Sequence, residues 1–311
     1  MIAPEPIAKN DFQPISPAFN RGKLWADFAD SKGAVLVVGH GTRNSSGALQ
    51  LRDLVFQMQI KEPLAKISGC FLELANPSIE QAIEELHSIG MRKILVVPVL
   101  LFTAAHALED IPDAVSQAAS RFGIEVIGQT GSLGTHPSVV SLSQTRYFEI
   151  RDLEQGYHCP EKACARVECS SGRCEGQNVC MGRIGLAMVG RGTSDPSALE
   201  HMRSLTDLKV VQLNPVRFQT GFFAGGKPNV DGLLEEASAW DCDTVLVQPH
   251  LLFEGELIEQ LRSKVLECQR RFSSKHWFVA RTLGADPKLA DVFLELAIEQ
   301  LASKSLSPSK E

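Results

Sequence analysis

Residues 38–42 read Val-Gly-His-Gly-Thr, and 151 residues later residues 189–193 read Val-Gly-Arg-Gly-Thr. The same offset returns other framework residues without a gap, so that Pro77 is matched by Pro228. Self-similarity at one fixed offset is typical of a duplicated fold. The sequence therefore predicts two similar halves that share one backbone design.

Three polar residues of the first copy are not kept in the second. His40, Glu73 and His106 are spaced evenly along the first copy, 33 residues apart. Their equivalents at the same offset are Arg191, Ala224 and Leu257. What both copies share is expected to maintain the fold, and what one copy lost is expected to carry the chemistry.

Short apolar runs alternate with longer amphipathic segments in both copies, which predicts βαβ units and parallel sheets. The expected fold is α/β: two tandem flavodoxin-like lobes with a cleft between them. The strands expected in the first copy are Ala34–Val38, Ile67–Leu74, Lys93–Leu101 and Glu125–Gly128. Those expected in the second are Ile184–Val189, Leu208–Leu213, Thr244–Gln248 and His276–Ala280.

The repeat and the composition together predict five consecutive regions. A polar, proline-containing extension comes first and is expected to lack a packed structure, and a short tail ends the chain. Between them lie a metal-binding lobe, a cysteine-rich insert and a second lobe without the metal site. The predicted bounds are 1–30, 31–155, 156–182, 183–303 and 304–311.

The charge balance argues against nucleic acid or an anionic membrane surface as a partner, because both require a basic protein surface. The net charge is −6 and the isoelectric point is about 5.8. The longest apolar run, Ile94–Phe102, is too short to span a bilayer and contains Pro98. No secretory signal is visible, so we expect a cytoplasmic protein with reduced thiols.

His40, Glu73 and His106 are each expected at or just past the end of a strand. Ligands bind open parallel sheets at the carboxyl ends of the strands, so these three side chains should share one edge. Two imidazoles and a carboxylate suit Co(II), Ni(II), Fe(II) or Zn(II) and leave positions open for exchange. Glu73 lies in an apolar run, where a buried carboxylate needs a partner.

Five of the eight cysteines lie in the segment between the two copies. Thiols this dense in a cytoplasmic protein favour metal ligation over disulfides. The spacing does not match the usual zinc-ribbon or ferredoxin pairs, so an Fe–S cluster, zinc and uncoordinated or disulfide-bonded thiols all stay open. The residues concerned are Cys159, Cys164, Cys169, Cys174 and Cys180.

Three segments in order resemble the class II tetrapyrrole chelatases, and within them the sirohydrochlorin cobaltochelatase and ferrochelatase family. They are residues 38–43 (Val-Gly-His-Gly-Thr-Arg), 71–79 (Phe-Leu-Glu-Leu-Ala-Asn-Pro-Ser-Ile) and 97–106 (Val-Pro-Val-Leu-Leu-Phe-Thr-Ala-Ala-His). The resemblance implies insertion of Co(II) or Fe(II) into sirohydrochlorin, for cobalamin or sirohaem synthesis. Relatives that carry Fe–S clusters put that cofactor first for the cysteine insert.

The resemblance also implies roles for individual residues. His40, Glu73 and His106 would bind the metal, and a histidine would accept pyrrole protons. From the residues themselves, Arg43, Arg191, Arg217 and Lys227 are expected at or near strand ends, where Arg43 and Arg191 would bind the substrate's carboxylates. For Arg191 the alternative of an ion pair with Asp195 or another acid stays open. Gly39 and Gly41 would let the backbone approach the substrate. The alternatives are a metal or tetrapyrrole carrier, or a redox protein built on the cysteine cluster. A monomer and a homodimer both stay open.

Overall fold

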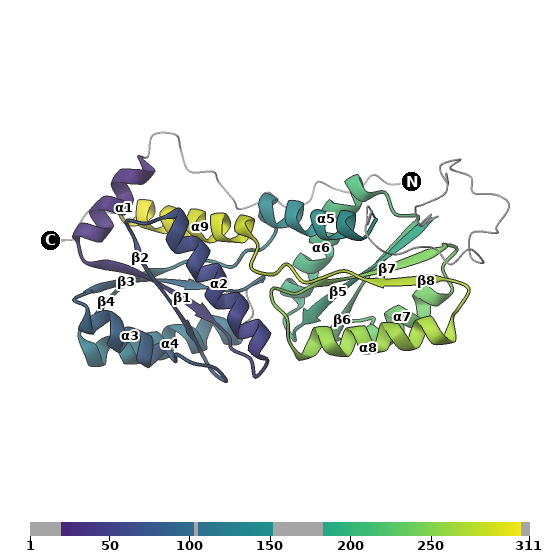
Figure 1. The fold of residues 1–311 in the computed structure, drawn as a ribbon, viewed down its shortest axis with the longest axis horizontal. Helices are drawn as coiled ribbons and strands as arrows, with labels where there is room; N and C mark the ends of the chain where they lie inside the picture. Colours follow the sequence, from purple (N-terminus) through teal and green to yellow (C-terminus); the bar gives the residue numbers. More distant parts are fainter. Residues whose placement is uncertain (1–19, 103–104, 152–182, 306–311) are drawn as a thin grey trace. The chain divides into compact units, whose positions relative to one another are not determined.

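The protein is described by a computed structural model covering residues 20–102, 105–151 and 183–305. It contains two four-stranded parallel sheets, with strand orders β2-β1-β3-β4 and β6-β5-β7-β8 (Figure 1). The predicted α/β fold with two parallel sheets is therefore confirmed. None of the helices in these ranges is long and apolar enough to cross a bilayer.

The first sheet and its neighbours follow the order expected for βαβ units. β1 lies in the centre with every residue buried, which explains its unbroken apolar sequence. The elements are α1 (Arg21–Asp30), β1 (Gly33–Gly39), α2 (Ser45–Lys61), β2 (Lys66–Phe71), α3 (Ile79–Ser88), β3 (Lys93–Pro98), α4 (Ala105–Phe122), β4 (Glu125–Gln129) and α5 (Pro137–Arg151).

The second copy repeats this order after the insert, with β5 central and β7 beside it. The same offset of 151 aligns the strand ends, so that Gly39 corresponds to Gly190 near the end of β5. The elements are β5 (Ile184–Gly192), α6 (Pro196–Leu213), β6 (Arg217–Ala224), α7 (Val230–Ser238), β7 (Thr244–His250), α8 (Glu256–Arg271), β8 (His276–Val279) and α9 (Pro287–Ser305).

Two predictions about local structure were wrong. The expected strand Leu208–Leu213 is the last part of α6, and the second strand of that sheet is β6. Asp195 caps this helix and Asn214, in the left-handed region, ends it. In the mispredicted stretch only Lys209 and Leu213, four residues apart, are buried, while Leu208 and Val211 are exposed, which is a helical pattern. A short apolar run with β-branched residues fits a buried helix as well as a strand.

The other wrong prediction concerns the N-terminal extension. Its last part is α1, capped by Asn20, whose side chain accepts a hydrogen bond from the Lys23 backbone N–H. Trp25 and Phe28 are buried in the core, and a Cβ on Gly33 would overlap the Phe28 ring. This helix is part of the fold, because it packs on β1 and α9. Residues 1–19 lie outside the described ranges.

The compact units of the structure do not follow the two halves of the sequence. Among the described residues, the first unit comprises 20–41, 51–102, 105–139 and 287–305, and the second comprises 42–50, 140–151 and 183–286. In Figure 1, α9 lies along the sheet of β1–β4, whereas α5 lies along the sheet of β5–β8. Each copy thus gives its last helix to the other copy's sheet.

Polar contacts specify where α5 packs. Lys209 is fully buried and donates to the Gln248 side-chain oxygen at 2.7 Å, and Gln248 donates to the Ser143 carbonyl of α5 at 2.6 Å. Burial holds the pKa of Lys209 well below its usual range. The equivalent positions in the first unit are Met58, Val97 and Phe293, all fully buried. A phenylalanine in place of Ser143 would keep the carbonyl but lose the hydroxyl that Gln248 also contacts at 3.3 Å, and would put an apolar ring beside the buried Lys209–Gln248 pair, so α9 fits the second sheet less well.

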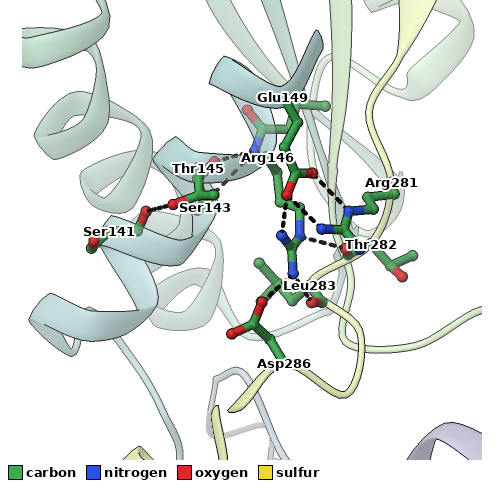
Figure 2. Close-up of polar contacts among 10 residues, drawn as sticks. Ser141, Ser143, Thr145, Arg146, Glu149, Arg281, Thr282, Leu283 and Asp286 are labelled. Carbon is green, nitrogen blue, oxygen red and sulfur yellow. Dashed lines mark hydrogen bonds and ion pairs between the residues drawn. The ribbon is translucent and has the colours of Figure 1, made fainter. Parts of the chain in front are cut away.

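A second set of contacts fixes α5 through Arg146, whose side chain is only 2% exposed. Figure 2 shows its guanidinium pointing into the loop after β8. It donates to the carbonyls of Thr282 at 3.1 Å and Leu283 at 2.6 Å, and to Asp286 at 2.8 Å. Glu149 accepts a further bond at 2.6 Å. The corresponding residue of α9 is Leu296, which has no donors for these carbonyls.

We expect Arg146→Met to lower the free energy of unfolding by about 3 kcal/mol or more, because it leaves two carbonyls and a carboxylate without their donors. Arg183→Met is the matched control, since Arg183 pairs with the exposed Asp241 and its loss should change stability much less. Urea denaturation followed by circular dichroism measures both. Equal shifts of the two midpoints would contradict this account of α5.

Candidate metal site

His40 and Glu73 meet at the carboxyl edge of the first sheet. His40 directly follows β1, and Glu73 lies two residues past the end of β2. Parallel pairing continues beyond the strands, because Leu72 N–H donates to the Gly39 carbonyl at 2.8 Å and Glu73 N–H donates to the His40 carbonyl at 3.0 Å. These bonds bring His40 Nε2 within 3.5 Å of Glu73 Oε1.

That distance suits two ligands of one ion. A nitrogen and an oxygen each about 2.1 Å from a tetrahedral metal lie about 3.4 Å apart. The side chains of His40 and Glu73 are 45% and 53% exposed, so an ion can reach them from solvent. The pair is therefore placed as an open, exchangeable site requires.

The exposure of Glu73 corrects one step of the sequence-based interpretation. β2 ends at Phe71, and Leu74 has a φ of 62°, so the apolar run turns before it is complete. Glu73 is in this turn and not inside a strand. The argument that a buried carboxylate needs a partner was wrong, although the position of Glu73 at the sheet edge is as predicted.

The third expected ligand lies next to this edge along the chain. His106 is the second residue of α4, which follows β3. Its side chain is outside the described part of the structure, so its ligation stays a prediction. Among the side chains that are described, no three His, Cys, Asp or Glu residues come together in a way that could hold a metal ion.

Gly41 makes the approach of the two ligands sterically possible. Its φ is 107°, and a Cβ there would lie 1.7 Å from the Glu73 carbonyl oxygen. Gly192, its equivalent, has a φ of 79° and stands in the same relation to Ala224, at 1.8 Å. The glycine is thus part of the shared backbone design. Gly39 is buried, and its missing side chain makes room for Leu51; contact of either first-copy glycine with substrate stays a prediction.

The second copy has side chains of different character at the equivalent positions. Ala224 ends β6, and Leu257 packs against the core of the second unit. Arg191, near the end of β5, is exposed and makes no ion pair or hydrogen bond with any described residue. Asp195, one alternative partner, instead accepts from Ser197 at the start of α6.

The remaining basic candidates differ in position. Arg43 is exposed and, like Arg191, has no polar partner among the described residues. Lys227 is exposed beyond the carboxyl end of β6. Arg217 begins β6, so it lies at the opposite edge of the sheet, where Glu236 is 3.8 Å away. Arg217 is therefore not at the edge where ligands bind.

Two histidines that the sequence leaves outside the metal set are buried. His136 lies 3.3 Å from Glu295, and burial lowers its pKa. His250 ends β7, and burial together with Lys209 lowers its pKa to about 3, so it is neutral at ordinary pH. Both belong to the packed interior of their units.

The cysteines divide into two groups. Cys70, Cys242 and Cys268 are buried free thiols. Burial raises the pKa of Cys70 to about 12, which makes it unreactive. Cys159, Cys164, Cys169, Cys174 and Cys180 lie outside the described residues, so metal ligation by the insert stays a prediction.

With this geometry in view, comparison with known proteins identifies the family. The CbiX family model matches residues 34–150 and 185–300, which are most of the chain and coincide with its two copies. The chain belongs to the CbiX family. The resemblance to the sirohydrochlorin chelatases is thereby confirmed at the level of the family.

Alignments with named relatives cover most of the length of this CbiX protein. The sirohydrochlorin ferrochelatase of Bacillus subtilis is 28% identical over 275 residues, 88% of this chain and 93% of that protein. The sirohydrochlorin cobaltochelatase of Priestia megaterium is 24% identical over 269 residues, 86% and 80% of the two chains. The structure of SirB from Bacillus subtilis with Fe3+ has a TM-score of 0.69 at 24% identity, and covers 88% of this chain and 97% of that one. That likeness shows the fold.

Gly41→Ala is expected to weaken Co(II) binding at the His40–Glu73 pair at least 10-fold, because the new methyl group pushes the Glu73 backbone away. Gly192→Ala introduces the same strain in the second copy and should leave Co(II) affinity unchanged. Calorimetric titration of both variants with Co(II) tests this. Only the binding that His40→Ala abolishes is assigned to the site. Equal affinities for the two variants would mean that Gly41 does not position the ligands.

Proposed function

We propose that this CbiX protein is a sirohydrochlorin chelatase that inserts Co(II) or Fe(II) into the tetrapyrrole. The observation that carries the proposal is the exposed His40–Glu73 pair at 3.5 Å, present in one copy and absent from the other. The names of the relatives in Bacillus subtilis and Priestia megaterium support the substrate. They divide between iron and cobalt, and a site of nitrogen and oxygen ligands accepts either ion.

The reaction exchanges a divalent ion for two pyrrole N–H protons. In the proposed mechanism His40, Glu73 and His106 hold the incoming ion, and the carboxylate of Glu73 offsets part of its charge. A neutral imidazole accepts a pyrrole proton, since the pKa of histidine lies near working pH. The ion then transfers from these exchangeable ligands to the four nitrogens of the macrocycle.

Sirohydrochlorin carries carboxylates, and an acidic protein needs local cations to bind them. Arg43 and Arg191 are exposed and have no polar partner among the described residues, which supports this role. A guanidinium can donate two parallel hydrogen bonds to one carboxylate. We therefore assign these two arginines to substrate binding.

Anaerobic absorbance of sirohydrochlorin with Co(II) or Fe(II) tests the activity. The wild-type protein should convert many equivalents of substrate, and His40→Ala/His106→Ala should fall to the uncatalysed rate. His87→Ala/His201→Ala is the matched control, which removes two histidines elsewhere and should keep full activity. Conversion that stops near one equivalent would favour a carrier, and a wild type no faster than the uncatalysed reaction would refute the chelatase.

Arg191→Ala should raise the KM for sirohydrochlorin about 10-fold or more while kcat changes little, because one charge-assisted contact is lost in ground state and transition state alike. Arg217→Ala removes the same charge at the opposite sheet edge and should leave KM unchanged. Steady-state kinetics at saturating metal distinguish the two. An unchanged KM in Arg191→Ala would remove this residue from the substrate site.

A further inference from the structure

The turn that carries Glu73 has the same backbone hydrogen bonds in both copies. Ala75 N–H donates to the Glu73 carbonyl at 2.8 Å, and the equivalent Gly226 N–H donates to the Ala224 carbonyl at 2.7 Å. The two ends of each turn are also joined, by Phe71 N–H to the Pro77 carbonyl at 2.9 Å and by Phe222 N–H to the Pro228 carbonyl at 3.1 Å. The second copy therefore shows what this turn requires when it carries no metal ligand.

The residue after Glu73 differs between the copies although its conformation does not. Leu74 has a φ of 62°, and its equivalent Gly225 has a φ of 67°. This left-handed region favours glycine, because a Cβ there comes too close to the following carbonyl. In the second copy a Cβ at Gly225 would also lie 1.9 Å from the Thr193 carbonyl oxygen. The first copy thus holds a leucine where the conformation favours glycine, and this leucine costs stability.

Packing in the interior does not offset this cost. Leu74 is 52% exposed, whereas Leu72, two residues earlier, packs against the core of the first unit. Among the described residues, that core does not include Leu74. A single exposed leucine needs no explanation, but a leucine that takes the place of glycine in a strained conformation does. These observations favour a contact between Leu74 and a molecule outside the folded chain.

The position of Leu74 indicates what that molecule is. Of the exposed large hydrophobic residues in the described part of the chain, Leu74 is the one in a loop that follows a strand; the others lie in helices, in strands or in loops that precede a strand. The loop after β2 is at the carboxyl edge, where parallel sheets bind ligands. Leu74 is also next to Glu73, and consecutive Cα atoms are about 3.8 Å apart. A large ligand that meets Glu73 therefore comes within reach of Leu74.

A tetrapyrrole has the matching chemistry, because its ring is flat with apolar faces and its carboxylates lie at the rim. To receive an ion from Glu73, the four nitrogens at the ring centre must lie over the carboxylate, so the surrounding pyrroles extend over neighbouring residues. We propose that Leu74 is a substrate-binding residue whose side chain packs against the face of the sirohydrochlorin ring. The proposal rests on the chelatase function proposed above, and adds an apolar contact to the carboxylate contacts.

Leu74→Asn is the informative substitution, because asparagine tolerates the left-handed region and is close to leucine in size but has a polar end. We expect the Kd for sirohydrochlorin in the absence of metal, and the KM for sirohydrochlorin, to rise about 10-fold. Leu74→Met keeps an apolar side chain and should stay close to the wild type. Leu64→Asn is the matched control: Leu64 is 57% exposed in the loop before β2, at the opposite edge of the sheet, and its substitution should change neither constant.

The Co(II) affinity and the thermal midpoint distinguish a substrate contact from support of Glu73. Both should be close to wild type in Leu74→Asn, because the leucine contacts the ring and not the ion. Calorimetric titration measures Co(II) binding, and anaerobic absorbance titration measures sirohydrochlorin binding. A fall in Co(II) affinity as large as the fall in sirohydrochlorin affinity would mean that Leu74 positions Glu73, and would overturn the inference. Equal losses in Leu74→Met and Leu74→Asn would overturn it too.

The same titrations keep this inference separate from the proposed function. If the wild type binds and converts sirohydrochlorin, and Leu74→Asn matches it in Kd and KM, the role of Leu74 is wrong and the chelatase stands. If the wild type binds no sirohydrochlorin, both proposals are wrong.

Discussion

The burial of Arg146 is the constraint on which much of the second unit depends. Its guanidinium holds the loop after β8 by two carbonyls and Asp286 (Figure 2). In that loop, Thr282 donates to Glu254 at 3.4 Å, and Glu254 N–H donates to Gln50 of α2. A continuous series of contacts therefore runs from a helix of the first copy to the segment that follows His40. Losing the buried charge would loosen every member of this series.

The duplication separates backbone requirements from side-chain chemistry. At both Gly41 and Gly192 a side chain would collide with a backbone carbonyl. Arg52 and Arg203 likewise occupy equivalent positions, and they donate to the carbonyls of Asn76 and Lys227. These contacts hold the sheet edge together, so both copies need them. Side chains that point to solvent at that edge are free to change, which is how the second copy can carry Arg191 where the first carries His40.

Much of the fold, and the meeting of His40 with Glu73 at one sheet edge, could be predicted from the sequence, because buried parallel strands such as β1 are unbroken apolar runs whose carboxyl ends share one edge. β6 was missed because the end of α6 has the same composition as a strand. The exchange of α5 and α9 depends on contacts as remote in sequence as Ser143 and Gln248, which no local pattern contains.

A metal that is a substrate places different demands on a site from a metal that stays. The proposed reaction requires an ion to arrive, be held and leave within one turnover, and a closed set of four ligands would retain it. His40 and Glu73 are about half exposed, which keeps exchange open but also leaves their geometry weakly defined by their own packing. Precision must then come from the backbone, which is held by β1 and by its hydrogen bonds to the Glu73 segment.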